Sequence, residues 1–161
     1  DVDYLYMDVG GGSTEYSLHR GKEVVRSKSF NIGTIRLLAD KVKKSEWQKM
    51  QEFLQELSTS PRNIEFVGSG GSINTAHKLS KRPSNAVLDY AYIKKLYEQI
   101  DRLTVDERIV LHGLKPDRAD VLPIALKLYL RSMEWTEADI IHVPKFGLSD
   151  GMIRALYHQH S

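Results

Sequence analysis

Two carboxylates, Asp8 and Glu15, flank a run of three glycines, Gly10 to Gly12, and two hydroxyl residues, Ser13 and Thr14. Glycines lack Cβ atoms and can turn successive N–H groups toward one anionic oxygen, so this run could hold a phosphate group closely. The hydroxyls add donors. The carboxylates could hold Mg²⁺ through waters or orient a water molecule, because hard cations prefer oxygen ligands. The alternative is a hairpin turn that needs positive φ.

A second glycine-rich run, Gly68-Ser69-Gly70-Gly71-Ser72, lies between a predicted strand and a predicted helix. The N-terminus of that helix would add free N–H groups and the positive end of its dipole. A dinucleotide-binding pattern would need glycine where Ile73 stands, and neither run has the G-K-[ST] ending of the Walker pattern. A turn that only packs tightly is the alternative. Two such runs at strand ends favour phosphate binding.

The elements around these runs predict an α/β fold. Apolar and alternating stretches predict strands at 3–9, 13–20, 23–30, 64–67 and 139–143. Helical spacing predicts helices at 33–42, 45–57, 90–103, 115–135 and 149–158, with further helices after the second glycine run and after Thr104. The expected sheet is mixed and five-stranded, antiparallel at one edge and parallel elsewhere, with helices on both faces and added helices.

Three helix starts have side chains that could cap them. Ser45 with Gln48 and Thr104 with Glu107 have the spacing of a capping box, in which side chain and backbone satisfy each other. Asp89 precedes the helix predicted at 90–103 and is a suitable N-cap residue.

The composition argues against several function classes. The 161 residues suit one domain, and a net charge of +2 without a basic, aromatic-rich block predicts no nucleic acid partner. The absence of cysteine excludes disulfides, thiolate metal sites and a cysteine nucleophile; it fits a reducing compartment, and we expect a cytoplasmic protein. No apolar run approaches the ~18 residues of a membrane span, so no membrane partner is expected. The start at Asp1 suggests a cut inside a longer protein.

Five segments in order resemble the Ppx/GppA phosphatases, which comprise exopolyphosphatases and guanosine pentaphosphate phosphohydrolases. The segments are "MDVGGGSTEYSL", "SFNIGTIRLLADKV", "FVGSGGSINTAHKL", "ERIVLHGLKPDRADVL" and "FGLSDGMIRAL". The first is similar to the family's second phosphate loop. The third is similar to its "G-x-G-G-T" turn, with Ser72 in place of the threonine.

The resemblance implies an actin-like ATPase domain with the ribonuclease H-like fold. Family members bind phosphate chains in a cleft between two such domains, and residues 1–161 resemble the second, C-terminal lobe as a single domain. The first lobe, with the other phosphate loop and the glutamate usually taken as the general base, is expected outside this chain. The isolated lobe is therefore expected to be inactive alone, and the full-length protein could form a homodimer.

The implied activity is release of terminal phosphate from inorganic polyphosphate or pppGpp by water, with Mg²⁺ as cofactor. Asp8 and Glu15 would be the catalytic and metal-binding residues. Arg36 and Arg118 are candidate phosphate partners, because a guanidinium matches phosphate oxygens; the alternative for each is a surface salt bridge or helix-face charge. The expected phosphate-binding set is Gly10, Gly11, Gly12, Ser13, Thr14, Gly68, Gly70, Gly71, Ser72, Arg36 and Arg118.

Two other functions share these loops. One is a phosphate- or alarmone-binding module that senses its ligand without hydrolysis. The other is a lobe of a sugar or carboxylate kinase with the actin fold, which would depend on ATP. The segment "GLKPDRADVL" argues against the kinase, because it resembles the phosphatases.

Overall fold

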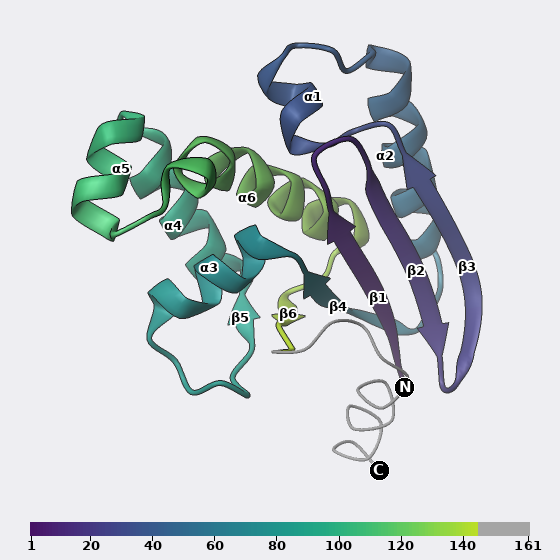
Figure 1. Ribbon diagram of the computed structural model, residues 1–161. Coiled ribbons are helices and arrows are strands. Elements are labelled where there is room, and N and C mark those ends of the chain that lie inside the picture. The colour runs from purple at the N-terminus through teal and green to yellow at the C-terminus, as the bar shows by residue number, and fades with distance from the viewer. Residues whose placement is uncertain (145–161) are drawn as a thin grey trace.

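The computed structural model describes residues 1–144, which form one six-stranded sheet and six helices (Figure 1). The strands are β1 (Val2–Val9), β2 (Thr14–Arg20), β3 (Glu23–Phe30), β4 (Asn63–Ser69), β5 (Leu88–Asp89) and β6 (Ile140–His142). The helices are α1 (Thr34–Leu38), α2 (Lys44–Ser58), α3 (Gly71–Ser80), α4 (Tyr90–Asp101), α5 (Val105–His112) and α6 (Pro116–Thr136).

The sheet is mixed, in the strand order β3-β2-β1-β4-β6-β5. The first three strands form the predicted antiparallel meander, and β4 and β6 extend it in parallel to β1. The five predicted strands are all present. The sixth, β5, consists of Leu88 and Asp89 paired antiparallel to β6, and two residues are too few to show an alternating pattern.

The two faces of the sheet bury different side chains, because neighbouring residues of a strand point to opposite faces. On β1, Leu5 and Met7 belong to the large hydrophobic core, whereas Tyr4 and Tyr6 form a smaller cluster with Val67. Each of the six described helices contributes to the large core and none to the smaller cluster. The helix predicted at 149–158 lies outside the described residues.

The long helix α6 organises the large core. It packs against each of the other five described helices, and in Figure 1 it lies between α1 and α2 on one side and α3 to α5 on the other. Arg108 of α5 fixes the approach to α6: its Nε donates to the Ile100 carbonyl at 3.0 Å and its Nη1 to the Ala119 carbonyl at 2.9 Å. No helix within residues 1–144 combines the length and apolarity that a bilayer crossing requires.

Two of the three predicted helix caps are present in the structure. The Asp89 carboxylate accepts from the Tyr92 N–H at 2.7 Å, and Thr104 with Glu107 forms the predicted capping box. The box predicted for Ser45 and Gln48 is wrong. Helix α2 starts at Lys44, with Lys43 at the N-cap and no side-chain cap, so Ser45 lies inside the first helical turn.

An ion cluster fixes the end of the sheet that is opposite to the glycine loops. The buried Asp3 carboxylate accepts from Arg20 Nη2 at 2.8 Å and from Arg62 Nε at 2.6 Å. Burial alone would raise the pKa of Asp3, but the hydrogen bonds and charges of the two guanidinium groups outweigh it and lower that pKa.

Candidate functional site

The two glycine runs lie next to each other because the strands before them are parallel neighbours. The β1–β4 register pairs Asp8 with Ser69, so both strands end at the same edge of the sheet. Gly70, with φ of +117°, is in a backbone conformation that side chains rarely adopt. A Cβ there would also lie 3.4 Å from the Val9 carbonyl oxygen and 3.7 Å from Asp8 Oδ1. The second loop therefore lies in close contact with the end of β1.

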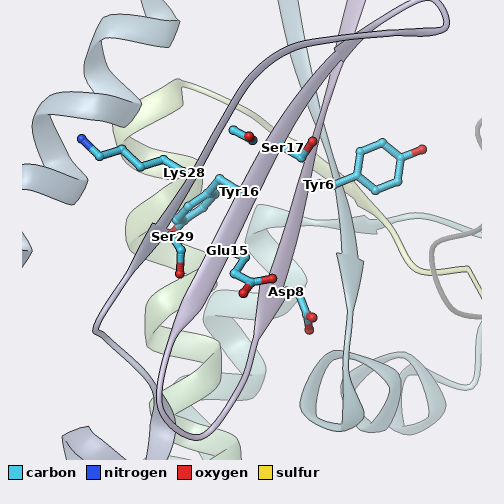
Figure 2. A pocket seen from close by; sticks show the side chains of 8 residues that line it. Tyr6, Asp8, Glu15, Tyr16, Ser17, Lys28 and Ser29 are labelled. Carbon is cyan, nitrogen blue, oxygen red and sulfur yellow. The ribbon is translucent and has the colours of Figure 1, made fainter.

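Asp8 and Glu15 face each other across the β1–β2 ladder, and both side chains are exposed. Figure 2 shows the two carboxylates side by side on one face of the sheet. Like charges directly opposite in a ladder are destabilising, and a cation between them would remove that cost. The pair opens onto a cavity of about 470 Å³ lined by Tyr6, Asp8, Glu15, Tyr16, Ser17, Ser27, Lys28 and Ser29.

These two carboxylates fit Mg²⁺, because that ion commonly uses one or two carboxylates and takes its other ligands from water and substrate phosphates. Within residues 1–144, no group of three acidic or histidine side chains could form a complete protein cage for a metal. A metal ion held by Asp8 and Glu15 would thus need oxygen atoms of the substrate or of water as its remaining ligands.

Backbone hydrogen bonds from the start of α1 hold the first glycine loop in place. The Gly10 carbonyl accepts from the Thr34 N–H at 3.0 Å, and the Gly11 carbonyl accepts from Ile35 at 2.9 Å and Arg36 at 3.2 Å. The loop thus supplies acceptors for the free N–H groups at the start of the helix. Gly33 makes this approach possible, because a Cβ there would overlap the Gly11 carbonyl.

Two groups that the sequence suggested as phosphate donors are used inside the protein. The Gly10 N–H donates to the Ser13 carbonyl at 2.9 Å. The Thr14 hydroxyl is fully buried and donates to the Ile32 carbonyl at 2.6 Å. In the described part of the chain, the N–H groups of Gly11, Gly12 and Ser13 have no hydrogen-bond acceptor. They are the donors of this loop that remain for a ligand.

Arg36 and Arg118 each contact one of the two loops. Arg36 Nε donates to the Gly12 carbonyl at 2.6 Å, and Arg118 Nη1 donates to the Ser72 hydroxyl at 2.9 Å. The Arg118 guanidinium also covers Gly71 so closely that a Cβ at Gly71 would overlap it. Neither arginine forms an ion pair with a carboxylate of residues 1–144, so the salt-bridge alternative has no support there.

Gly68 has a different reason to be glycine. It is buried, and a Cβ there would lie 2.8 Å from Ile141 Cδ1, 3.1 Å from Ile73 Cγ1 and 3.3 Å from Tyr129 Cε1. Tight packing against the core therefore accounts for Gly68, which is the alternative that the sequence left open. Gly70, Gly71 and Ser72 remain at the site.

Tyr129, a fully buried residue of α6, supports the site from the core. Its hydroxyl lies 3.3 Å from the Met7 carbonyl and 3.2 Å from the Ser69 carbonyl, so it bridges the ends of β1 and β4 beneath the two loops. Burial, and secondarily the negative charge of Asp8, raise the pKa of Tyr129 well above its ordinary value. The hydroxyl stays protonated and can donate. Helical periodicity places such a residue in the core but does not show which carbonyls it meets.

Comparison with known proteins identifies relatives of this chain. The model of the Ppx/GppA phosphatase family matches residues 1–160. The Aquifex aeolicus Ppx/GppA family member has a crystal structure that is 26% identical, with a TM-score of 0.71 over 99% of this chain. An exopolyphosphatase from Cytophaga hutchinsonii, 22% identical over 99% of this chain with a TM-score of 0.73, has the same fold.

A curated relative is the guanosine-5'-triphosphate,3'-diphosphate pyrophosphatase of Vibrio vulnificus, which is 22% identical over 92% of this chain. The chain spans 32% of that protein and 57% and 58% of the Aquifex and Cytophaga chains.

Proposed function

The chain belongs to the Ppx/GppA phosphatase family, and from this we propose that it forms the second lobe of a hydrolase that releases terminal phosphate from inorganic polyphosphate or pppGpp. The observation that carries the proposal is the meeting of two glycine loops at one sheet edge, beside a cross-strand pair of carboxylates. Like-charged carboxylates next to unused N–H donors suit a reaction in which a cation and a phosphate bind together.

In this proposal the first loop holds the phosphate that is to be released. The N–H groups of Gly11, Gly12 and Ser13 point donors at its oxygens, and Arg36, fixed on Gly12, places a cation at the same loop. At the second loop, Arg118 places a cation, and Ser72, to which Arg118 donates, carries a hydroxyl that can contact phosphate. Phosphoryl transfer needs positioning and charge neutralisation more than covalent chemistry, so these contacts are the lobe's main contribution.

Asp8 and Glu15 would hold Mg²⁺ or orient the attacking water. When bound, Mg²⁺ would neutralise phosphate charge and lower the pKa of a bound water. A first lobe outside this chain would supply the general base, so the isolated chain is expected to bind phosphates without fast turnover.

Phosphate release from polyphosphate and from pppGpp, with Mg²⁺, tests this function in the full-length protein and in this chain. Asp8→Asn and Glu15→Gln keep the shape of the side chains but remove one charge each, and we expect full-length activity to fall at least about hundredfold. Glu52→Gln, an exposed residue of α2, is the matched control and should leave the activity unchanged.

Unchanged release in both site variants would contradict the roles of Asp8 and Glu15. Binding without release by the full-length protein would instead favour the sensor function. Rapid turnover by this chain alone would refute the need for a second lobe.

A further inference from the structure

A cavity of about 560 Å³ lies beside the second glycine loop, between α3 and the connection from α5 to α6. We name it the basic groove, because four cationic side chains and one carboxylate line it. Its lining residues are Gly71, Thr75, Lys78, Leu79, Lys81, His112, Gly113, Leu114, Lys115, Asp117 and Arg118.

Within residues 1–144, no carboxylate lies in ion-pair contact with the cations of the basic groove, which are Lys78, Lys81, Lys115 and Arg118. The three lysines are exposed. Arg62, elsewhere in the fold, pairs with two aspartates. Like charges gathered in one cavity raise the local potential and attract anions.

The position of the charges in the helices adds to this. Lys78 and Lys81 are at the C-terminal end of α3, where a helix favours cations. Lys115 and Arg118 are at the N-cap and in the first turn of α6, where the helix disfavours them, and no side chain caps that end. A bound anion would offset this unfavourable placement, whereas helix stability alone does not explain it.

The groove is continuous with the candidate site. Gly71 and Arg118 line it, and the same Arg118 donates to the Ser72 hydroxyl of the second loop at 2.9 Å. A molecule with several linked phosphates, held at the loops by one of them, would therefore meet the lysines with its other phosphates.

We propose that the basic groove binds the phosphate groups of the substrate that are remote from the bond being cleaved, and that Lys78, Lys81 and Lys115 set the preference for substrates carrying more phosphates. This rests on the proposed function. The remote phosphates could belong to a long polyphosphate chain or to the 3'-diphosphate of pppGpp, and both present the same chemistry to the lysines.

The test measures dissociation constants of long-chain polyphosphate, tripolyphosphate and pppGpp with this chain, for Lys78→Gln/Lys81→Gln and for Lys115→Gln. Each lost charge-assisted hydrogen bond should weaken binding about tenfold. We expect a loss of that size for each lysine removed when the ligand is long polyphosphate or pppGpp. For tripolyphosphate, which the loops can hold alone, we expect a change below about twofold. The ligand with the larger loss identifies the source of the remote phosphates.

Lys94→Gln/Lys95→Gln is the matched control, since both lysines are exposed on α4 and the net charge change is the same as in the α3 variant. Equal weakening by this control, an equal loss for tripolyphosphate, or no loss for either larger ligand would overturn the groove proposal. In the full-length protein, the groove variants should raise KM and leave kcat unchanged, whereas failure of the proposed function would remove release in the unmodified protein.

Discussion

Replacing Gly33 with alanine should displace the first glycine loop without replacing any residue proposed to bind phosphate. The new Cβ would overlap the Gly11 carbonyl and lie 2.7 Å from the Gly12 carbonyl carbon, where ordinary contact starts at 3.4 Å. The backbone would have to separate by at least about 0.7 Å at Gly12, and more at Gly11. Because all the crowded atoms are backbone atoms, no side-chain rotation can relieve the overlap.

The displacement should affect both stability and activity. The hydrogen bonds from the start of α1 to the loop carbonyls would lengthen, and overpacking of this kind costs about 2 kcal/mol of unfolding free energy. A misplacement near 1 Å can reduce a rate about hundredfold. Urea unfolding and phosphate release by the full-length protein would measure the two effects.

Gly21→Ala is the control for a glycine substitution as such. Gly21, in the turn between β2 and β3, has φ of +62° and open space for a Cβ, so alanine there adds backbone strain of about 1 kcal/mol and does not move the loop. Gly33→Ala with unchanged phosphate release would refute the idea that contact with residue 33 positions the loop.

Two further substitutions test the supports of the site and of the sheet. Tyr129→Phe removes the hydroxyl that bridges the ends of β1 and β4, and should lower the unfolding free energy by about 1 kcal/mol in a denaturant titration; an unchanged value would show that the bridge contributes nothing. Asp3→Asn should cost about 2 kcal/mol at neutral pH, because it leaves Arg20 and Arg62 without their buried partner. The pKa of Asp3 is lowered in the folded state, so its contribution is present above the unfolded pKa of about 3.9 and is lost as the pH falls through the folded value. Urea unfolding at decreasing pH should show a difference between wild type and variant that is full near neutral pH and narrows as the pH falls below about 3.9. A difference independent of pH would contradict the assignment.

The sequence was informative wherever a feature depends on neighbours along the chain. The apolar run of β1 and the alternation in β2 predicted strands of the meander, and Thr104 with Glu107 predicted a capping box that the structure contains. The order of elements predicted parallel strands, and the adjacency of the two glycine runs follows from that prediction.

Features that depend on long-range contacts were not predictable in the same way. Whether the Thr14 hydroxyl faces a ligand or the Ile32 carbonyl depends on how β3 returns to the loop. Whether Gly68 is needed for packing or for phosphate depends on contacts such as that with Tyr129 of α6, which is distant along the chain but close in space. Residue types in a glycine-rich run give the possible roles, and the packing around the run selects among them.

The bonding between the first loop and α1 also determines when the loop becomes ordered. Its carbonyls already serve as acceptors for the helix, so rotating the peptide planes of Gly10 or Gly11 would break hydrogen bonds on the far side of the loop. Three consecutive glycines would otherwise be among the most flexible segments of a protein. Here their conformational entropy is lost when the chain folds, not when a ligand arrives, so the loop is preorganised and the ordering cost is removed from the affinity.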